Sequence, residues 1–572
     1  MAAKIVIKIK DAFFLQEITY TDPVNAGKLV IGTNFPFQNS ADAQIAKNFD
    51  NLNGIYPNIK NAGNISESQQ VFAKLITMIS GLATNGKLES LFSVIDATDA
   101  INLMRKAHKR SDYIGENLLN FYSIEVNSRN VAQKLNEINE LKISTPILGI
   151  DYAYIRGELA SFEQEEVIPI PIDFSLLAPE PIIGDIIDSE TLKKIIEQQP
   201  NQMKMAKKNF ETAPKDSSQM LARSIETTLP ITDDIYVKAI FNTFDIYNKE
   251  NLTSTSPTKP TIKVVDIEQG WNFDKYSIAG ITPLRSKPIL GGGINYSEQL
   301  HGQKTLSVLF GSETPDVANT LNGLCEGADA LIASTWYDKT SGIEYREAAL
   351  TSVLGFTTPI GKIKPLNVGD VVLLELQVKP QFNIYPVPIK PEIPKTKKSK
   401  LPVEIEPLMW GVIKAGVYAG FIIIEPAGND NNDLNIVPNY ATNLPLRNVS
   451  NKNKTTCTEA IMVGAKKKDS SIFLNNGNRI DFNCYGEEVF TSASAAIVDT
   501  VEKKFSSTSL ASAITAALVA NIQSIAQKNI ALNRRLTISE LKLLLSTPMN
   551  VNTFISNSIA SNLFNYSKLI LP

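Results

Sequence analysis

The sequence predicts an α/β protein with a doubly wound, mostly parallel sheet, preceded by a small α+β domain. From residue 261 on, short apolar runs alternate with segments of helical spacing, as in sheets whose parallel strands are joined by helices. The runs 369–376 and 420–425 each contain four consecutive apolar residues, which is typical of strands buried on both faces. Residues 1–155 show strands and helical stretches of their own, and a proline-rich segment separates the two patterns.

Length and composition describe an ordinary globular protein of more than one domain. A chain of 572 residues is too long for a single hydrophobic core. A net charge of −3 favours neither nucleic acid nor an anionic membrane as a partner, and three scattered cysteines exclude a disulfide framework. No signal peptide is evident, and no apolar run reaches the roughly 18 residues of a membrane helix. We therefore expect a cytoplasmic protein without a membrane span, with export by another route left open.

The chain divides into four expected segments. Residues 1–155 form the α+β domain, of split βαβ type, and residues 156–258 form a proline-rich connecting arm. Residues 259–550 form the main α/β domain, and residues 551–572 form a C-terminal tail. The expected strands are 4–9, 118–126, 149–155, 262–268, 328–334, 369–376, 420–425 and 460–464. The expected helices lie within 69–106, 127–141, 189–199, 233–241, 344–354, 407–419 and 537–545, and a proline-rich surface loop spans 379–403.

Several chemically capable side chains lie where the active sites of such sheets gather, at the carboxyl ends of strands. Asp266 lies near the end of one strand, and Asn429 follows another in a Gly-Asn-Asp turn. Ser509 begins a long apolar helix, where backbone N–H groups favour a developing negative charge. Of the two histidines, His108 lies in a basic surface turn, which leaves His301 as the candidate base. Each residue alone is explained as well by a cap, a turn or a surface position, so their combination is what points to a site.

Four local motifs, in this order, resemble those of subtilisin-like serine peptidases. The segment 264–266 (Val-Val-Asp) resembles the strand-borne aspartate motif, and His301-Gly302 resembles the His-Gly-Thr motif that opens a helix. The segment 426–429 (Pro-Ala-Gly-Asn) is similar to Ala-Ala-Gly-Asn, and 505–511 is similar to Phe-Ser-Gly-Thr-Ser-x-Ala. The order Asp, His, Ser is that of subtilisin itself. The resemblance covers residues 261–547.

The resemblance implies a serine endopeptidase that hydrolyses peptide bonds through an acyl-enzyme. Ser509 would be the nucleophile and His301 its general base. Asp266 would orient the imidazole, and Asn429 would donate a side-chain hydrogen bond to the tetrahedral oxyanion. The backbone N–H of Ser509 would be the second donor. The resemblance implies no metal and no cofactor.

By the same resemblance, Glu375, Leu376 and Gln377 would bind a protein or peptide substrate as an added strand. Residues 1–155 look like the propeptide module of these enzymes and would act as an intramolecular inhibitor, with self-cleavage within 156–258. A different class of function stays open: a catalytically silent binding or scaffold protein of the same fold, with its cleft filled by residues 1–155.

The chain departs from the family pattern at several positions. Ser507 stands in place of the usual glycine, Gln303 in place of threonine, and Ala513 in place of proline. A side chain at Ser507 would strain the turn if φ there were positive. Glu375 and Gln377 stand in place of serine and glycine, which predicts a more crowded substrate strand.

Overall fold

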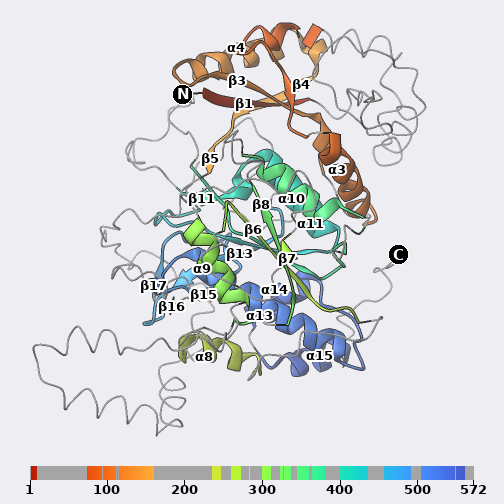
Figure 1. Ribbon diagram of the computed structural model, residues 1–572, viewed down its shortest axis with the longest axis vertical. Coiled ribbons are helices and arrows are strands. Elements are labelled where there is room, and N and C mark those ends of the chain that lie inside the picture. The colour runs from red at the N-terminus through yellow and green to blue at the C-terminus, as the bar shows by residue number, and fades with distance from the viewer. Residues whose placement is uncertain are drawn as a thin grey trace, which may run out of the picture.

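The computed structural model describes the chain in separate stretches. These are residues 2–9, 74–159, 235–246, 259–271, 282–283, 299–310, 323–335, 344–379, 400–435, 457–490 and 504–560, with short gaps inside the longer ones. The described residues form an N-terminal unit and a larger main unit that pack against each other (Figure 1). The expected helix over 189–199 and nearly all of the surface loop 379–403 lie outside the described residues.

The N-terminal unit is a four-stranded antiparallel sheet with helices, as expected for a small α+β domain. Its strands are β1 (Ala2–Ile9), β2 (Glu89–Ser90), β3 (Phe121–Asn127) and β4 (Ile150–Ile155), in the order β2-β3-β1-β4. Among the described residues it contains α3 (Val94–Ala107) and α4 (Val131–Ser144), with short 3-10 turns at Leu118–Asn120, Ser128–Asn130 and Pro146–Leu148. Residues 74–75 and 77–80 are helical as well.

Both faces of this small sheet are buried, because side chains alternate along β1. Ile5 and Ile7 pack into a core that includes Leu135 of α4. Val6 points the other way and joins the core that continues into the main unit. The N-terminal unit is therefore packed directly against the main unit.

The main unit contains an eight-stranded, mainly parallel sheet. The strand order is β14-β13-β12-β9-β6-β8-β7, with β15 also paired to β13, and among the described strands only β14 runs antiparallel to its neighbour. The strands are β6 (Lys263–Glu268), β7 (Thr282–Pro283), β8 (Asp329–Ser334), β9 (Val371–Leu374), β12 (Ile422–Pro426), β13 (Ile461–Lys466), β14 (Ile472–Phe473) and β15 (Phe482–Tyr485). This topology confirms the expected mixed α/β fold with a mainly parallel sheet.

Helices cover both faces of the sheet (Figure 1). Helices α9 (Gln299–Phe310) and α13 (Thr508–Lys528) pack together on one face, and α10 (Arg346–Gly355) and α11 (Pro407–Tyr418) pack together on the other. The remaining helices are α8 (Ile235–Thr243), α14 (Ile538–Ser546) and α15 (Val551–Ala560), with a 3-10 turn at Val403–Ile405. Helix α3 of the N-terminal unit lies against α10 and α11.

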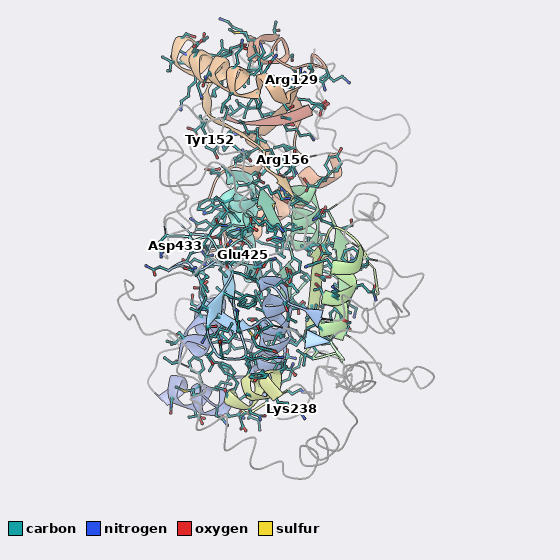
Figure 2. The ribbon with its side chains drawn as sticks, turned by 90° about the vertical axis from the view of Figure 1, so that its left-hand side faces the viewer. Arg129, Tyr152, Arg156, Lys238, Glu425 and Asp433 are labelled. Carbon is teal, nitrogen blue, oxygen red and sulfur yellow. The ribbon has the colours of Figure 1, made fainter. Side chains whose placement is uncertain are left out.

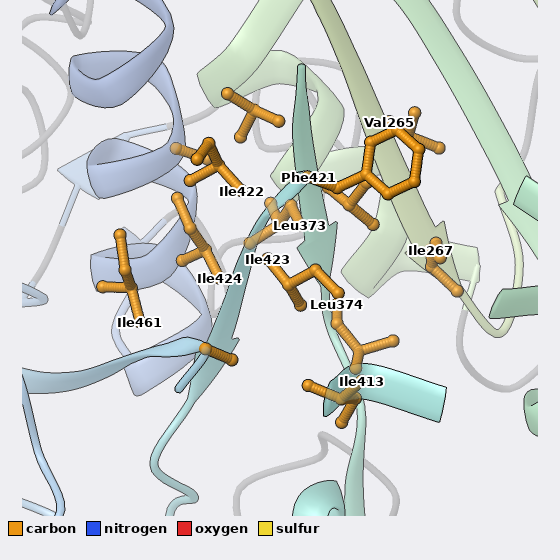
Figure 3. Close-up of a cluster of buried hydrophobic side chains, with 14 of the residues drawn as sticks. Val265, Ile267, Leu373, Leu374, Ile413, Phe421, Ile422, Ile423, Ile424 and Ile461 are labelled. Carbon is orange, nitrogen blue, oxygen red and sulfur yellow. The ribbon is translucent and has the colours of Figure 1, made fainter. Parts of the chain in front are cut away.

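The centre of the sheet is a continuous aliphatic layer (Figure 3). Val265 of β6, Leu373 of β9 and Ile423 of β12 are buried together there, with Ile413 of α11. These are the four-residue apolar runs that the sequence shows, and because both faces are covered their side chains find apolar neighbours on either side. Burial of each such side chain contributes roughly 1.5–3 kcal/mol.

Three details differ from the sequence expectations. Strand β9 is shorter than 369–376, because Gly369 takes a positive φ of 81° and the Leu376 N–H donates to Leu374 O, which turns the chain after the strand. Helix α15, expected as part of a tail, packs against α13 with Phe554 buried. Helix α13 is long and apolar enough to cross a membrane by length and composition, but 94% of its apolar window is buried in the protein, as in a core helix.

Three smaller strands lie beside the main sheet: β5 (Glu158–Leu159), β10 (Gln377–Lys379) and β11 (Leu401–Pro402), in the order β11-β10-β5. A further pair joins β16 (Val489–Phe490) to β17 (Lys504–Phe505), just before α13.

Candidate active site

The candidate residues gather at the carboxyl edge of three neighbouring strands, β12, β9 and β6. Parallel pairing sets Ile267 of β6 beside Leu374 of β9, so Glu268 and Glu375 follow at adjacent positions. The Glu375 N–H donates to Ile267 O at 3.0 Å, which ties the two strand ends together. Asn429 follows β12 on the other side of β9. The fold therefore brings residues up to 161 positions apart in the sequence to one edge.

His301 lies in the first turn of α9 and contacts the end of β6. Its Nδ1 lies 2.6 Å from Glu268 Oε2, and both side chains are buried. Gly302 makes this approach possible, because a Cβ there would lie 2.2 Å from Gly270 O and 2.7 Å from Glu268 Cγ. A carboxylate bound to one imidazole nitrogen fixes the ring and favours a proton on that nitrogen.

Asp266, which we expected to orient the imidazole, does not contact His301 in this way. Its Oδ2 accepts a hydrogen bond from Trp271 Nε1 at 3.0 Å, and Glu268 occupies the place beside His301. Residues 266 and 268 lie on the same face of a strand, and β6 continues to Glu268, which puts the later carboxyl nearer the start of α9. Burial, and next the charge of Glu268, raise the pKa of Asp266 well above its ordinary value.

Ser509 lies in the first turn of α13. Ser507 is the N-cap residue, with an extended φ of −175°, and its hydroxyl accepts the Leu510 N–H at 2.9 Å. A side chain at this position therefore causes no backbone strain, contrary to the possibility raised by the sequence. The Thr508 N–H is also taken, by Asn429 Oδ1 at 2.9 Å. In the first turn the N–H groups on either side of the Ser509 N–H are therefore both occupied by side-chain acceptors.

Asn429 is held in one orientation by Thr508. Its Oδ1 accepts from both the N–H and the hydroxyl of Thr508, at 2.9 and 2.7 Å. With its oxygen so engaged, the amide NH₂ of Asn429 is the group left to act as a donor. Gly428 takes a φ of 99°, and a Cβ there would lie 2.4 Å from Lys400 O, so the turn requires glycine.

Asn475 is a supporting residue that motif reasoning did not assign. Its Nδ2 donates to Lys400 O and Ala427 O, both at 2.7 Å, and its Oδ1 accepts the Asn432 N–H at 2.8 Å. It thereby fixes the turn that carries Asn429. An asparagine in a Asn-Asn-Gly-Asn segment is a turn signal, but nothing local reveals which turn it supports.

Glu375 points toward the other carboxyl groups and not toward solvent. Its side chain is fully buried, and burial, then the charges of Glu268 and Asp266, raise its pKa well above the ordinary value. The Ser509 hydroxyl lies close enough to lower that pKa. Neither Glu375 oxygen makes a well-aligned hydrogen bond to a described residue. Ser509 is itself fully buried, and its hydroxyl makes no hydrogen bond to a described residue.

A short strand that follows the N-terminal unit, β5, pairs with the strand that begins at Gln377, one of the expected substrate residues. Gln377 begins β10, and β10 pairs antiparallel with β5, Val378 opposite Leu159 and Lys379 opposite Glu158. Because the two strands are antiparallel, Leu159 lies nearer to Glu375 along β10 than Glu158 does. β5 thus pairs with β10 just beyond the expected substrate residues Glu375, Leu376 and Gln377.

Buried ion pairs hold this segment at the junction of the two units. Figure 2 shows Arg156 there, and its guanidinium contacts Glu347 at 2.7 Å and Glu344 at 2.8 Å. The next residue, Gly157, donates its N–H to Glu406 at 2.7 Å and accepts from Arg346 at 2.6 Å. Within the described ranges, no group of three or more histidine, cysteine, aspartate or glutamate side chains is arranged to hold a metal ion.

The chain is similar to several solved protease structures. A cold-adapted subtilisin-like serine proteinase is 15% identical, with a TM-score of 0.31 over 53% of this chain and 84% of that chain. The prenylagaramide maturation protease PagA is 14% identical, with a TM-score of 0.32 over 54% of this chain and 87% of its own. The patellamide maturation protease PatA is 14% identical, with a TM-score of 0.30, over 50% and 85%. No protein-family model and no curated protein matches the sequence.

Proposed function

We propose that this protein is a serine endopeptidase in which Ser509 is the nucleophile, His301 the general base and Glu268 the carboxylate that orients the imidazole. The observation that carries the proposal is the buried 2.6 Å pair of His301 Nδ1 and Glu268 Oε2. Asn429, which follows β12, is tied to Thr508, the residue before Ser509. A carboxylate on Nδ1 leaves Nε2 as the proton acceptor, which is the arrangement a hydroxyl nucleophile requires. Glu268 takes the role that the sequence suggested for Asp266.

The reaction follows from these groups. Ser509 Oγ attacks the scissile carbonyl carbon while its proton passes to His301 Nε2, and the imidazolium is stabilised by Glu268. The oxyanion of the tetrahedral intermediate accepts from the Ser509 N–H and the Asn429 amide. The C–N bond then breaks, the leaving amine takes the proton from His301, and an ester to Ser509 remains. Water, deprotonated by His301, then hydrolyses that ester. His301 returns the proton to Ser509 Oγ as the acyl group leaves.

The substrate would be an extended peptide that pairs with β10 in place of β5. The N-terminal unit would then act as an intramolecular inhibitor, since β5 already holds that edge and Arg156 is anchored beside it. Because β5 runs antiparallel to β10, its last residue, Leu159, lies on the side of β5 that is nearer to Glu375. We therefore expect self-cleavage in the arm 156–258, shortly beyond Leu159.

Mass spectrometry of the purified full chain tests this function. The wild type is expected to yield fragments that end shortly after Leu159, and Ser509→Ala is expected to remain intact. Ser512→Ala is the matched control, because Ser512 is equally buried one turn further along α13. Identical fragments from wild type and Ser509→Ala would indicate a contaminating protease and would count against the proposal.

The oxyanion role of Asn429 has a separate test. Asn429→Ala is expected to slow cleavage about 10²–10³-fold, as loss of such a donor does in subtilisin, the case from which that figure comes. Asn432→Ala changes a neighbouring asparagine whose side chain binds Asn475, and it is expected to have a smaller effect. Equal rates in the two variants would remove Asn429 from the mechanism.

One observation favours a second function. Ser509 is fully buried and β10 is already paired on both edges, by β11 and β5. A protein that never releases β5 would be a catalytically silent binding or scaffold protein of the same fold. Labelling of Ser509 by a fluorophosphonate distinguishes the two, because a silent site would not react.

A further inference from the structure

The turn that carries Asn429 is held by a side chain from the segment between β14 and β15. We call residues 427–432 the oxyanion turn. Asn475, a fully buried residue of that segment, donates from Nδ2 to Ala427 O at 2.7 Å. Its Oδ1 accepts the Asn432 N–H at 2.8 Å. A single amide therefore binds both ends of the oxyanion turn.

The same amide also binds the residue that precedes β11. Asn475 Nδ2 donates to Lys400 O at 2.7 Å, and the Lys400 N–H donates to Asp430 Oδ2, also at 2.7 Å. Strand β11 pairs antiparallel with β10, with Pro402 opposite Gln377. Lys400 is thus bonded to the oxyanion turn through both of its main-chain groups. Through β11, the turn is joined to the strand that the proposed function assigns to the substrate.

Close packing holds the main chain of the oxyanion turn against Asn475. Gly428 has a φ of 99°, and a Cβ there would lie 2.4 Å from Asn475 Nδ2. The Asn475 N–H donates to Gly428 O at 3.3 Å. Thr508 binds the side-chain oxygen of Asn429, whereas Asn475 binds the main chain on either side of it. Two separate sets of contacts therefore determine where the Asn429 amide lies.

An asparagine amide offers two N–H donors and an acceptor oxygen, and Asn475 uses both kinds on main-chain groups. The group that the oxyanion turn presents to the substrate acts on an oxyanion, which develops only as the tetrahedral intermediate forms. A displacement of about 1 Å of such a group can slow the reaction 10²-fold. Loss of the Asn475 contacts should therefore slow the chemical step and leave binding of the reactant unchanged.

Resting on the proposed function, we propose that Asn475 is a positioning residue that sets the Asn429 amide for the oxyanion by binding the oxyanion turn to β11. It acts through Asn429 and does not itself touch the reacting atoms. By this arrangement the strand that binds substrate and the turn that stabilises the oxyanion form one connected unit.

The test is the rate of Ser509 labelling by a fluorophosphonate, whose phosphonyl oxygen takes the place of the oxyanion, in the full chain with and without Arg156→Glu. Asn475→Asp keeps the size and the acceptor oxygen of the side chain but removes its two N–H donors. It is expected to lower the maximal labelling rate about 10–10²-fold, with the half-saturating concentration of the reagent unchanged. Asn478→Asp, the same change at an exposed asparagine of the same segment, is the matched control and is expected to label like wild type.

A double variant shows whether Asn475 acts through Asn429. In the Asn429→Ala background, Asn475→Asp is expected to cause no further loss, because the group that it positions is absent. Asp430→Ala removes the other bond to Lys400 and is expected to slow labelling in the same way, again only when Asn429 is present. Because Asp430 is only partly buried, this variant decides the matter if Asn475→Asp does not fold.

The outcomes separate this inference from the proposed function. Slower labelling in Asn475→Asp and Asp430→Ala that disappears in the Asn429→Ala background supports the inference. An unchanged rate in either variant, or the same loss with Asn429→Ala present, would overturn it and leave the proposed function intact. If Ser509 is labelled in none of the proteins, the proposed function is overturned and this inference with it.

Discussion

Two kinds of buried carboxyl cluster lie within one protein, and they differ in their counter-charges. The structural clusters contain arginine: Arg156 and Arg346 stand among three glutamates at the junction of the units, and Arg479 stands among Glu404, Glu425 and Asp481. The cluster at Ser509, formed by Asp266, Glu268 and Glu375, has no lysine or arginine among the described charges that act on Asp266 and Glu375.

Arginine lowers the pKa of some carboxyl groups in the structural clusters, although burial still raises the pKa of Glu425 and Glu406 there. Burial alone would raise the pKa of Glu347, but its bidentate pair with Arg156 lowers that pKa to about 2. Asp266 and Glu375 have pKa values raised well above the ordinary range, because burial and like charge act together. A fully buried charge with its arginine fixes a fold, whereas a carboxyl group without one is available for proton chemistry.

The largest effect is expected from neutralising the carboxylate at His301. Glu268→Gln keeps the shape of the side chain but removes the charge that stabilises the imidazolium, so cleavage should slow by about 10⁴-fold. Asp266→Asn is the matched control, because it removes a carboxyl two residues away that binds Trp271. Peptide-cleavage rates of the two variants decide between them. A larger loss in Asp266→Asn would reverse the assignment of the two carboxylates.

Removing the arginine from the structural cluster around Arg479 should lower the stability of the fold and not impair catalysis. Arg479→Met leaves Glu404 and Glu425 buried without their cation, whereas Asp481 keeps its pair with Lys542, and the change is expected to lower the free energy of unfolding by about 3–5 kcal/mol. Urea unfolding monitored by tryptophan fluorescence measures this. Arg129→Glu, at an exposed position of the N-terminal unit, controls for a change of charge alone. An unfolding midpoint equal to that of wild type would mean that Arg479 does not balance its cluster.

A smaller effect is expected in the dependence of stability on pH, within the junction cluster. Glu347 has its pKa lowered from 4.5 to about 2, so its carboxylate stabilises the folded state above pH 4.5, and about 3 kcal/mol is lost as the pH falls toward 2. Burial raises the pKa of Glu406 from 4.5 to about 7, so the folded state binds that proton more tightly and loses about 3 kcal/mol as the pH rises from 4.5 to 7.

Two glutamine variants separate the two pH dependences of the free energy of unfolding. Glu347→Gln should remove the acid-side loss, and Glu406→Gln should remove the loss between pH 4.5 and 7, as measured by unfolding midpoints across that range. If the unfolding midpoints of both variants changed with pH as those of the wild type do, groups other than Glu347 and Glu406 would control the pH dependence of stability.

Most of the fold could be predicted because its signals are local. The runs of four apolar residues lie in and beside β9 and β12, as expected. Of the two possible caps that the sequence offers for α14, Thr537 and Ser539, the structure has Thr537, in a capping box with Glu540. The end of β9 could not be predicted. The chain turns at Leu376, but Leu376 is itself apolar and extends the apolar run of the strand, so the sequence gives no sign of the turn. The packing of α15 on α13 likewise depends on tertiary contacts.

The candidate site was located by its motifs but not resolved in detail. Periodicity cannot distinguish Asp266 from Glu268, because both lie on one face of β6. Helix α9 packs closely on the end of β6 at Gly302, and this contact shows that Glu268 is the carboxyl beside His301. The roles of Asn475 and Glu375 depend on contacts between strand ends and turns far apart in the sequence.

His108 is half-buried against Tyr113, and burial lowers its pKa. It lies on the N-terminal unit, at the end of α3.

The most direct measurement is fluorophosphonate labelling of Ser509, located by peptide mass spectrometry, in the full chain and in the full chain with Arg156→Glu. The account predicts a single labelled residue, Ser509, with faster labelling in Arg156→Glu and almost none in Glu268→Gln. Absence of labelling in both the full chain and Arg156→Glu would contradict the account and leave the silent scaffold as the function of this fold.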